Sequence, residues 1–158
     1  MFTVTHAIPV NVPEEPILTR SDVWRGLVEK SRNAVPFVEA ITYCEVIAEI
    51  SPLQFDREIE FHKEFLKERI TLEPESQVTF ERLSGTVLGT IWNTIEEDDG
   101  ALMLRFTFTL SVDGIAGGSA EERAYSERMT AGYVNAVKTT LAAIRENARA
   151  AGSPIAVA

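Results

Sequence analysis

The chain has 158 residues, of which 45% are hydrophobic and 25% are charged, a composition typical of a globular protein and not of a disordered one. Its formal net charge of −9 would repel a phosphate backbone, which argues against nucleic acid as a partner. No apolar run approaches the roughly 20 residues of a membrane span, and no signal-peptide pattern is present, so we expect a cytoplasmic protein without membrane insertion. The length is that of a single domain, which we expect over residues 1–158.

The N-terminal forty residues predict one strand and two short helices. Residues 2–11 alternate in polarity, which is typical of a strand. Thr19 can cap a helix with Asp22 three residues later, and the apolar stripe that begins at Val23 predicts about three turns. Pro36 ends that helix and can begin a second short one, because its fixed backbone angle suits a first helical turn.

The middle of the chain predicts an antiparallel meander. Its polarity repeats every two residues, and turn residues recur about every ten positions. We expect six strands, near residues 41–50, 55–61, 65–72, 77–83, 86–95 and 101–112.

The C-terminal segment predicts one long helix. Ser119 and Glu122 have the spacing of a capping box, and apolar residues then follow helical spacing to about Arg149. At about 1.5 Å per residue, such a helix can cross the whole width of a six- or seven-stranded sheet. Its apolar face carries Tyr125, Met129, Tyr133, Val137, Leu141, Ile144 and Ala148.

This order of elements predicts an α+β fold in which a curved, seven-stranded antiparallel sheet wraps around the long helix. The apolar face of such a sheet must be covered, and only the helices can cover it. A curved sheet cannot pack flat on one helix everywhere. We therefore expect an internal hydrophobic cavity suited to a small hydrophobic ligand.

Strand register predicts a row of charges on the concave face. A two-residue turn at His62 and Lys63 places Arg57 opposite Glu68. Continuing through the next turn, the apolar phase places Glu68 opposite Arg82. All three charges therefore share a face with apolar side chains.

The remaining strands extend this face. We expect Val87, Gly89, Ile91, Asn93 and Ile95 to pair with Leu110, Phe108, Phe106, Leu104 and Leu102, with Gly89 making room beside Phe80 and Phe108. The residues expected to line the cavity are Arg57, Glu68, Arg82, Asn93, Phe80, Gly89, Ile91, Leu104, Phe106, Phe108, Tyr125, Met129 and Tyr133.

The charged row has two interpretations. It can be a satisfied structural ion-pair network, as buried charges usually are. Alternatively, the two arginines can leave donors free for an anionic or carbonyl-bearing ligand, because one glutamate cannot satisfy two guanidinium groups. We expect no metal and no cofactor, since His6 and His62 have no acidic or cysteine residue at metal-ligand spacing.

Four segments carry a family resemblance: FTVTHAIPVN at residues 2–11, FLKERITLEPES at 65–76, IEEDDGALMLRFTF at 95–108 and GGSAEE at 117–122. On them the chain resembles the START-like or Bet v 1-like (SRPBCC) helix-grip superfamily, and within it the AtaL-like family. The resemblance implies one strand, two short helices, six strands and a long C-terminal helix around a hydrophobic pocket. The superfamily includes lipid carriers, plant hormone receptors and polyketide aromatase/cyclases, so the fold alone does not select a function.

Three functions therefore stay open. The first is a binding or carrier protein for a small hydrophobic molecule, such as a lipid or a polyketide-like compound. The second is a cyclase or dehydratase in which Glu68 acts as acid or base, although two flanking arginines would lower its pKa. The third is a protein-interaction module with a filled core, and an uncovered edge strand would also permit a homodimer.

Overall fold

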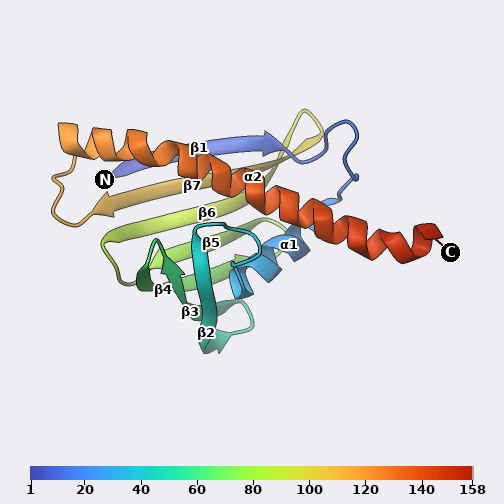
Figure 1. Cartoon of the computed structure of the whole chain (residues 1–158), viewed down its shortest axis with the longest axis horizontal. Helices are drawn as coiled ribbons and strands as arrows, with labels where there is room; N and C mark the ends of the chain where they lie inside the picture. The colour runs from blue at the N-terminus through green and yellow to red at the C-terminus, as the bar shows by residue number, and fades with distance from the viewer. Residues whose placement is uncertain (158) are drawn as a thin grey trace.

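The computed structural model describes residues 1–157, and the side chains of residues 1–151. It contains the expected seven strands and a long C-terminal helix (Figure 1). In chain order the elements are β1 (Phe2–Pro9), α1 (Arg20–Arg32), β2 (Ile41–Ser51), β3 (Gln54–Phe61), β4 (Glu64–Glu73), β5 (Gln77–Arg82), β6 (Val87–Asp98), β7 (Ala101–Val112) and α2 (Ala120–Val157).

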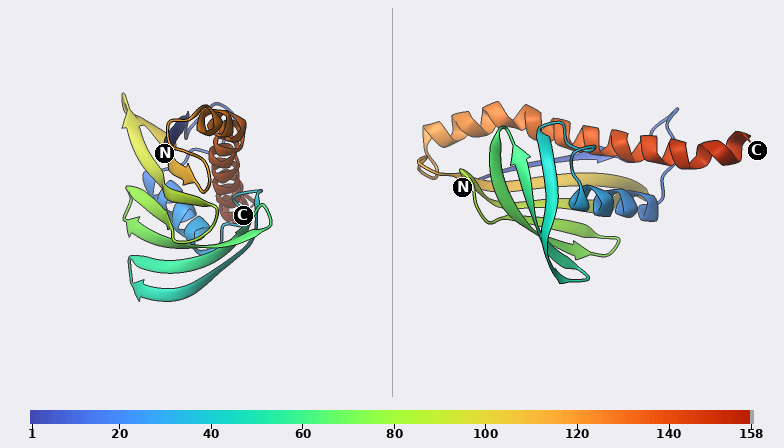
Figure 2. Two further views of the ribbon diagram at one scale, coloured as in Figure 1. Left: turned by 90° about the vertical axis from the view of Figure 1, so that its left-hand side faces the viewer. Right: turned by 60° about the horizontal axis from the view of Figure 1, so that its bottom comes forward.

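All seven strands form one antiparallel sheet in the order β1-β7-β6-β5-β4-β3-β2. The chain thus builds a meander from β2 to β7, and β1 adds to β7 at the far edge. The sheet twists strongly, so that β2 runs across the direction of β1 and β7, and α1 and α2 lie on its concave side (Figures 1 and 2). This is the predicted α+β arrangement of a curved sheet around a helix.

Local sequence explains where α1 begins. The Thr19 hydroxyl accepts a hydrogen bond from Asp22 N at 3.1 Å, and the Asp22 carboxylate accepts one from Thr19 N at 2.8 Å. This reciprocal capping box satisfies two backbone donors that a helix start leaves free. The helix then buries Val23, Gly26 and Leu27 against the sheet and α2.

The prediction of a second short helix after Pro36 is wrong. The segment after α1 forms a single turn, in which the Ala34 carbonyl accepts from the backbone N–H groups of both Phe37 and Val38. Pro36 lies inside this turn and has no N–H to continue a helical ladder. The chain then enters β2 at Ile41, so the turn serves to carry it from the end of α1 to the edge of the sheet.

The core lies between the concave face and the two helices. The buried side chains there come from β3 to β7 and from both helices, and they include Phe55, Ile70, Phe80, Phe106, Leu110 and Leu141. Phe2, Val4 and Ile8 of β1 are partly buried against them. The two helices approach each other closely at Gly26, where an added Cβ would lie 2.4 Å from Cγ1 of Ile144. A glycine at this position therefore permits the close packing of α1 on α2.

The β6–β7 register differs from the expected one by two residues. Gly89 pairs with Leu110, Ile91 with Phe108 and Asn93 with Phe106. The cause is a tight two-residue turn at Asp99 and Gly100, both at positive φ, whereas the longer acidic segment was expected to form the turn. A shift of two keeps the same face inward, so the concave face still carries the expected side chains.

Candidate functional site

A cavity of about 440 Å³ lies between the concave face, the C-terminal end of α1, the turn before β2 and the middle of α2. Its volume is in the range of roughly 300 to 1,000 Å³ that is usual for small-molecule sites. Most of its wall is apolar and consists of Val38, Ala40, Ile41, Ile59, Phe61, Phe80, Ile91, Phe106, Phe108, Met129 and Ala136.

The cavity opens to solvent at one side. Four of its lining residues are exposed: Glu39 in the turn before β2, His62 in the β3–β4 turn, and Gly132 and Asn135 on α2. These three segments therefore surround the mouth. An added Cβ at Gly132 would meet no atom within 4 Å, so α2 contributes no obstruction at this point.

The predicted charge row exists, and its first pair is tightly bonded. Arg57 pairs with Glu68 and Glu68 with Arg82 in the sheet, as the turn at His62 and Lys63 predicts. Arg57 and Glu68 are each only 2% exposed. The Arg57 guanidinium donates to Glu68 Oε1 from Nε and from Nη2, and from Nη1 to the backbone carbonyls of Lys30 and Ser31.

Arg57 therefore has a structural role. The carbonyls of Lys30 and Ser31 belong to the last turn of α1, where helical carbonyls lack partners within the helix. Arg57 satisfies them and fastens the end of α1 to β3. Its hydrogen bonds to these carbonyls and to Glu68 favour the interpretation of this half of the row as a structural network.

Glu68 stays a carboxylate. Burial by itself would raise its pKa, but the charges of Arg57 and Arg82, the hydrogen bonds from Arg57 and the charge of Lys30 lower the pKa below its usual value. A general acid must hold a proton near neutral pH, and a general base works best with a pKa close to the working pH. Glu68 meets neither requirement.

Arg82 differs from Arg57. Its side chain is only 7% exposed, and its Nε lies 3.6 Å from Glu68 Oε2, too far for a hydrogen bond. That Nε has no hydrogen-bond partner among the described residues. The guanidinium stacks near the ring of Phe61, with 5.2 Å from Cζ to the ring centroid. Arg82 is thus a buried positive charge that lines the cavity and has one donor without a hydrogen-bond partner among the described residues.

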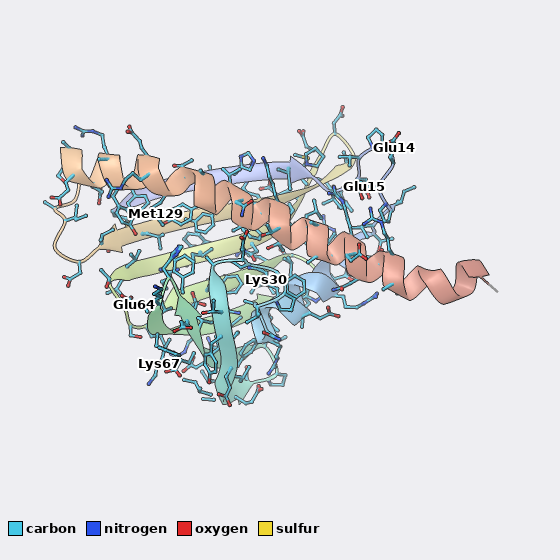
Figure 3. All side chains as sticks on the ribbon, viewed as in Figure 1. Glu14, Glu15, Lys30, Glu64, Lys67 and Met129 are labelled. Carbon is cyan, nitrogen blue, oxygen red and sulfur yellow. The ribbon has the colours of Figure 1, made fainter. Side chains whose placement is uncertain are left out.

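Lys30 also lines the cavity, although the sequence did not place it there. It lies in the last turn of α1 (Figure 3), and the residue is 5% exposed. Burial and the charge of Arg57 lower its pKa from 10.5 to about 7, against smaller opposing effects of Glu68 and Cys44. Nζ donates to Asn93 Oδ1 at 2.7 Å.

Tyr133 contributes a polar group from α2. Its ring stacks on that of Phe108, with centroids 4.3 Å apart, and burial raises the pKa of its hydroxyl to about 12. The hydroxyl therefore keeps its proton at neutral pH and can act as a hydrogen-bond donor.

Most residues expected from the sequence line this cavity: Arg57, Glu68, Arg82, Asn93, Phe80, Ile91, Phe106, Phe108, Met129 and Tyr133. Tyr125 instead lines a second cavity of about 220 Å³, which shares Phe61, His62, Arg82, Met129 and Tyr133 with the first. The two spaces thus adjoin at the Arg82 end.

Two expected residues lie elsewhere. Leu104 is fully buried in the core between β1 and β6 and lines neither cavity. Gly89 also lines neither cavity. An added Cβ there would lie 2.2 Å from the carbonyl oxygen of Thr109 on the neighbouring strand, and its φ is +136°. The glycine permits close approach of β6 and β7 rather than room for a ligand.

The sequence held a signal for Lys30. Val23, Gly26, Leu27 and Lys30 are spaced at i, i+3, i+4 and i+7, which places all four on one helix face. A lysine that ends an apolar stripe is usually solvated through its long stem, so the pattern alone does not predict burial. The lining from Gly132, Asn135 and Thr139 had no comparable signal, since small and polar residues there also suit an exposed helix face.

No helix in the described part of the chain is long and apolar enough to cross a membrane.

No curated protein matches the chain in sequence. Similar folds occur in solved structures. The Zhui aromatase/cyclase from Streptomyces sp. R1128 aligns with a TM-score of 0.65 at 20% identity, covering 96% of this chain and 98% of that one.

Two further structures show the same architecture. TTHA0849 from Thermus thermophilus has a TM-score of 0.67 at 11% identity, with 90% of this chain and 94% of that chain covered. Ara h 8.0201 has a TM-score of 0.54 at 14% identity, with 89% and 97% covered. At these identities the similarity establishes the fold, which is the expected helix-grip fold of START-like and Bet v 1-like proteins.

The family assignment rests on sequence. The model of the family AtaL, described as acetylaranotin biosynthesis cluster protein L, matches residues 4–151. This match covers nearly the whole chain, including residues 4–11 of the first segment that carried the resemblance and all of the other three. The chain belongs to the AtaL family, with the helix-grip fold that this resemblance implied.

Proposed function

We propose that this protein binds and carries a small hydrophobic molecule in the 440 Å³ cavity, with a carbonyl or anionic oxygen of that molecule at Arg82. The observation that carries the proposal is Arg82, a buried lining residue of a largely apolar cavity whose Nε has no hydrogen-bond partner among the described residues. A buried donor without a partner is costly, and a ligand oxygen would remove that cost.

The charge balance inside the cavity supports an acidic or carbonyl-bearing ligand. Among the buried side chains that line it, Lys30, Arg57 and Arg82 are basic and only Glu68 is acidic. The protein as a whole has a net charge of −9, so this interior excess of positive charge is local. An oxygen with negative charge or partial charge is the complement of such a site.

The family description and the structural neighbours suggest the chemical class. AtaL is named after a biosynthesis cluster, and several neighbours are aromatase/cyclases. Aromatic, oxygenated molecules of the polyketide type combine an apolar body with carbonyl groups, as this cavity requires. We propose that the chain acts as one such ligand-binding domain over its length, in the cytoplasm, without metal or cofactor.

Arg82→Met tests the proposal. The probes are 2-naphthoate, which carries a carboxylate, and 2-naphthalenemethanol, which has the same rings without a charge. Fluorescence titration should show that wild type binds both and that Arg82→Met loses about ten- to a hundredfold in affinity for 2-naphthoate alone, since a charged hydrogen bond contributes about 1.5–3 kcal/mol.

Arg105→Met is the matched control, because Arg105 lies on β7, is partly exposed and lines neither cavity. It should bind both probes like wild type. Failure of wild type to bind either probe would contradict the ligand cavity. Equal affinity of wild type and Arg82→Met for 2-naphthoate would contradict the role of Arg82.

A cyclase or dehydratase is the second candidate, and one observation favours it: Lys30 has a pKa of about 7 and lies in the cavity, as a general base at neutral pH requires. In this case Lys30, and not Glu68, would carry the chemistry. Recovery of a bound host metabolite unchanged after prolonged incubation would favour the carrier, whereas its conversion, lost in Lys30→Met, would favour the enzyme.

A further inference from the structure

The amine of Lys30 lies in an unusual environment for a lysine. It belongs to a buried residue that lines the cavity, and its Nζ lies 4.5 and 4.8 Å from the ring centroids of Phe80 and Phe106. In the described part of the chain it forms no ion pair, because Glu68 is occupied by Arg57 and Arg82. Its one hydrogen bond goes to Asn93 Oδ1.

Asn93 adds a second polar group to the same place. It is fully buried in β6 and lines the cavity beside Lys30. Its Oδ1 accepts from Lys30, whereas its Nδ2 has no hydrogen-bond partner among the described residues. A nucleophilic nitrogen and an amide donor without a partner in this part of the chain thus belong to two hydrogen-bonded residues that line the same, largely apolar cavity.

The protonation state of the amine suits a nucleophile. An exposed lysine is almost wholly protonated at neutral pH, and only the neutral amine attacks a carbonyl. The groups that act on Lys30 are Arg57 on β3, Glu68 on β4 and Cys44 on β2, and together with burial they leave its pKa at about 7. A large fraction of the amine is therefore free at neutral pH.

We infer that Lys30 Nζ forms a reversible imine with aldehydes, or with reactive ketones, that enter the cavity. In this step the nitrogen forms a bond to the carbonyl carbon, and Asn93 Nδ2 donates a hydrogen bond to the carbonyl oxygen. The two hydrogens of the neutral amine leave with that oxygen as water, and a carbon–nitrogen double bond remains. No oxidant, reductant or further reactant is needed. The inference rests on the proposed function, because the carbonyl compound must first bind in the cavity.

Reductive trapping tests the imine. The protein is incubated at pH 7 with 2-naphthaldehyde and sodium cyanoborohydride, which converts an imine into a stable amine, and the modified lysine is located by peptide mass mapping. Lys63, Lys67 and Lys138 are exposed and serve as internal controls. We expect Lys30 to react first, at least about tenfold faster than Lys67, because about half of its amine is deprotonated at this pH, against a very small fraction of an exposed lysine.

Three comparisons separate the cavity amine from general reactivity. An excess of 2-naphthalenemethanol, which binds without a carbonyl, should slow the labelling of Lys30 and leave Lys67 unaffected. Lys30→Arg should abolish the fast labelling, whereas Lys67→Met should keep it. The rate at Lys30 should rise with pH and level off just above pH 7, while the rate at Lys67 should still rise at pH 9.

The outcomes also distinguish this inference from the proposed function. If 2-naphthalenemethanol binds in the fluorescence titration but Lys30 reacts no faster than Lys63, Lys67 and Lys138, the imine is refuted and the binding function stands. If the alcohol and 2-naphthoate do not bind at all and Lys30 remains unlabelled, both are refuted. Fast labelling of Lys30 that the alcohol suppresses supports both.

Discussion

Arg57 binds a single oxygen of Glu68 twice, with 3.0 Å from Nε and 2.8 Å from Nη2 to Oε1. The other carboxylate oxygen, Oε2, faces Arg82 at 3.6 Å. Glu68 is thus hydrogen-bonded to Arg57 but only within ion-pair distance of Arg82. Arg57 is therefore a structural residue, whereas Arg82 keeps a donor that a ligand can use. Stability and ligand binding should therefore respond to different members of the row.

Glu68→Gln should lower the free energy of unfolding by about 3–5 kcal/mol, because Arg57 and Arg82 would remain buried without an anion. Urea denaturation measures this change. Glu81→Gln, an exposed position on β5, should change the same quantity by less than about 0.5 kcal/mol. A loss below about 1 kcal/mol in Glu68→Gln would argue against the buried network.

Stability should depend on pH through Lys30. Its pKa falls from 10.5 in the unfolded chain to about 7 in the folded one, so between these values the unfolded state binds more protons. The free energy of unfolding should therefore gain up to about 1.4 kcal/mol per pH unit from this group as pH rises from 7 to 10.

Urea denaturation of wild type and Lys30→Met at pH 7, 8 and 9 isolates that gain. The variant should be relatively more stable at pH 7, and its advantage should shrink as pH rises, because Lys30 no longer has to lose a proton on folding. Lys67→Met, which removes an exposed lysine, should follow wild type. Parallel curves for wild type and Lys30→Met would mean that the amine is not buried as described.

Substitution of two helical glycines by alanine should change the free energy of unfolding in opposite directions. Gly26→Ala should destabilise by about 1–3 kcal/mol, since its Cβ would overlap Cγ1 and Cδ1 of buried Ile144. Gly132→Ala should stabilise by about 0.5–1 kcal/mol, since its Cβ meets open space and alanine favours helix.

The Gly26 effect should be smaller in an Ile144→Ala background, which a double-mutant cycle by thermal or urea unfolding can measure. An unchanged cost in that background would place the strain elsewhere than at the contact between α1 and α2.

A large side chain at the mouth should slow ligand entry. Gly132→Trp places an indole over an opening that α2 leaves clear, so the association rate of 2-naphthoate should fall while the free energy of unfolding changes little. Stopped-flow fluorescence measures the rate, and Glu146→Trp, an exposed position elsewhere on α2, is the control. Equal association rates in the two variants would place the entrance at another side.

The strand order and most of the register could be predicted because local rules determine them. The two-residue turn at His62 and Lys63 fixes which residues of β3 and β4 face each other, and the apolar phase then places Arg82 beside Glu68. The same reasoning failed by two residues at β6–β7, where the tight turn at Asp99 and Gly100 lies inside an acidic segment that looked like a loop.

What the sequence could not predict depends on contacts between elements that no pairing rule relates. Arg57 is satisfied by carbonyls of α1, so its role depends on where that helix ends against the sheet. Burial of Lys30 depends on how the end of α1 packs against Phe80, Asn93 and Phe106 of the sheet. Both features depend on tertiary packing. The hypothesis from sequence therefore treated Arg57 and Arg82 alike and did not include Lys30 among the cavity residues.

The position of Lys30 also couples ligand uptake to proton uptake. An anion that enters the cavity raises the pKa of the nearby amine, as Glu68 already does and Arg57 opposes. Between about pH 7 and 9, binding of an acid should therefore draw a proton from solvent, and its calorimetric enthalpy should change with the ionisation enthalpy of the buffer. Alkaline conditions would then weaken the binding of an acidic cargo, whereas the affinity for a neutral cargo would not depend on pH through this amine.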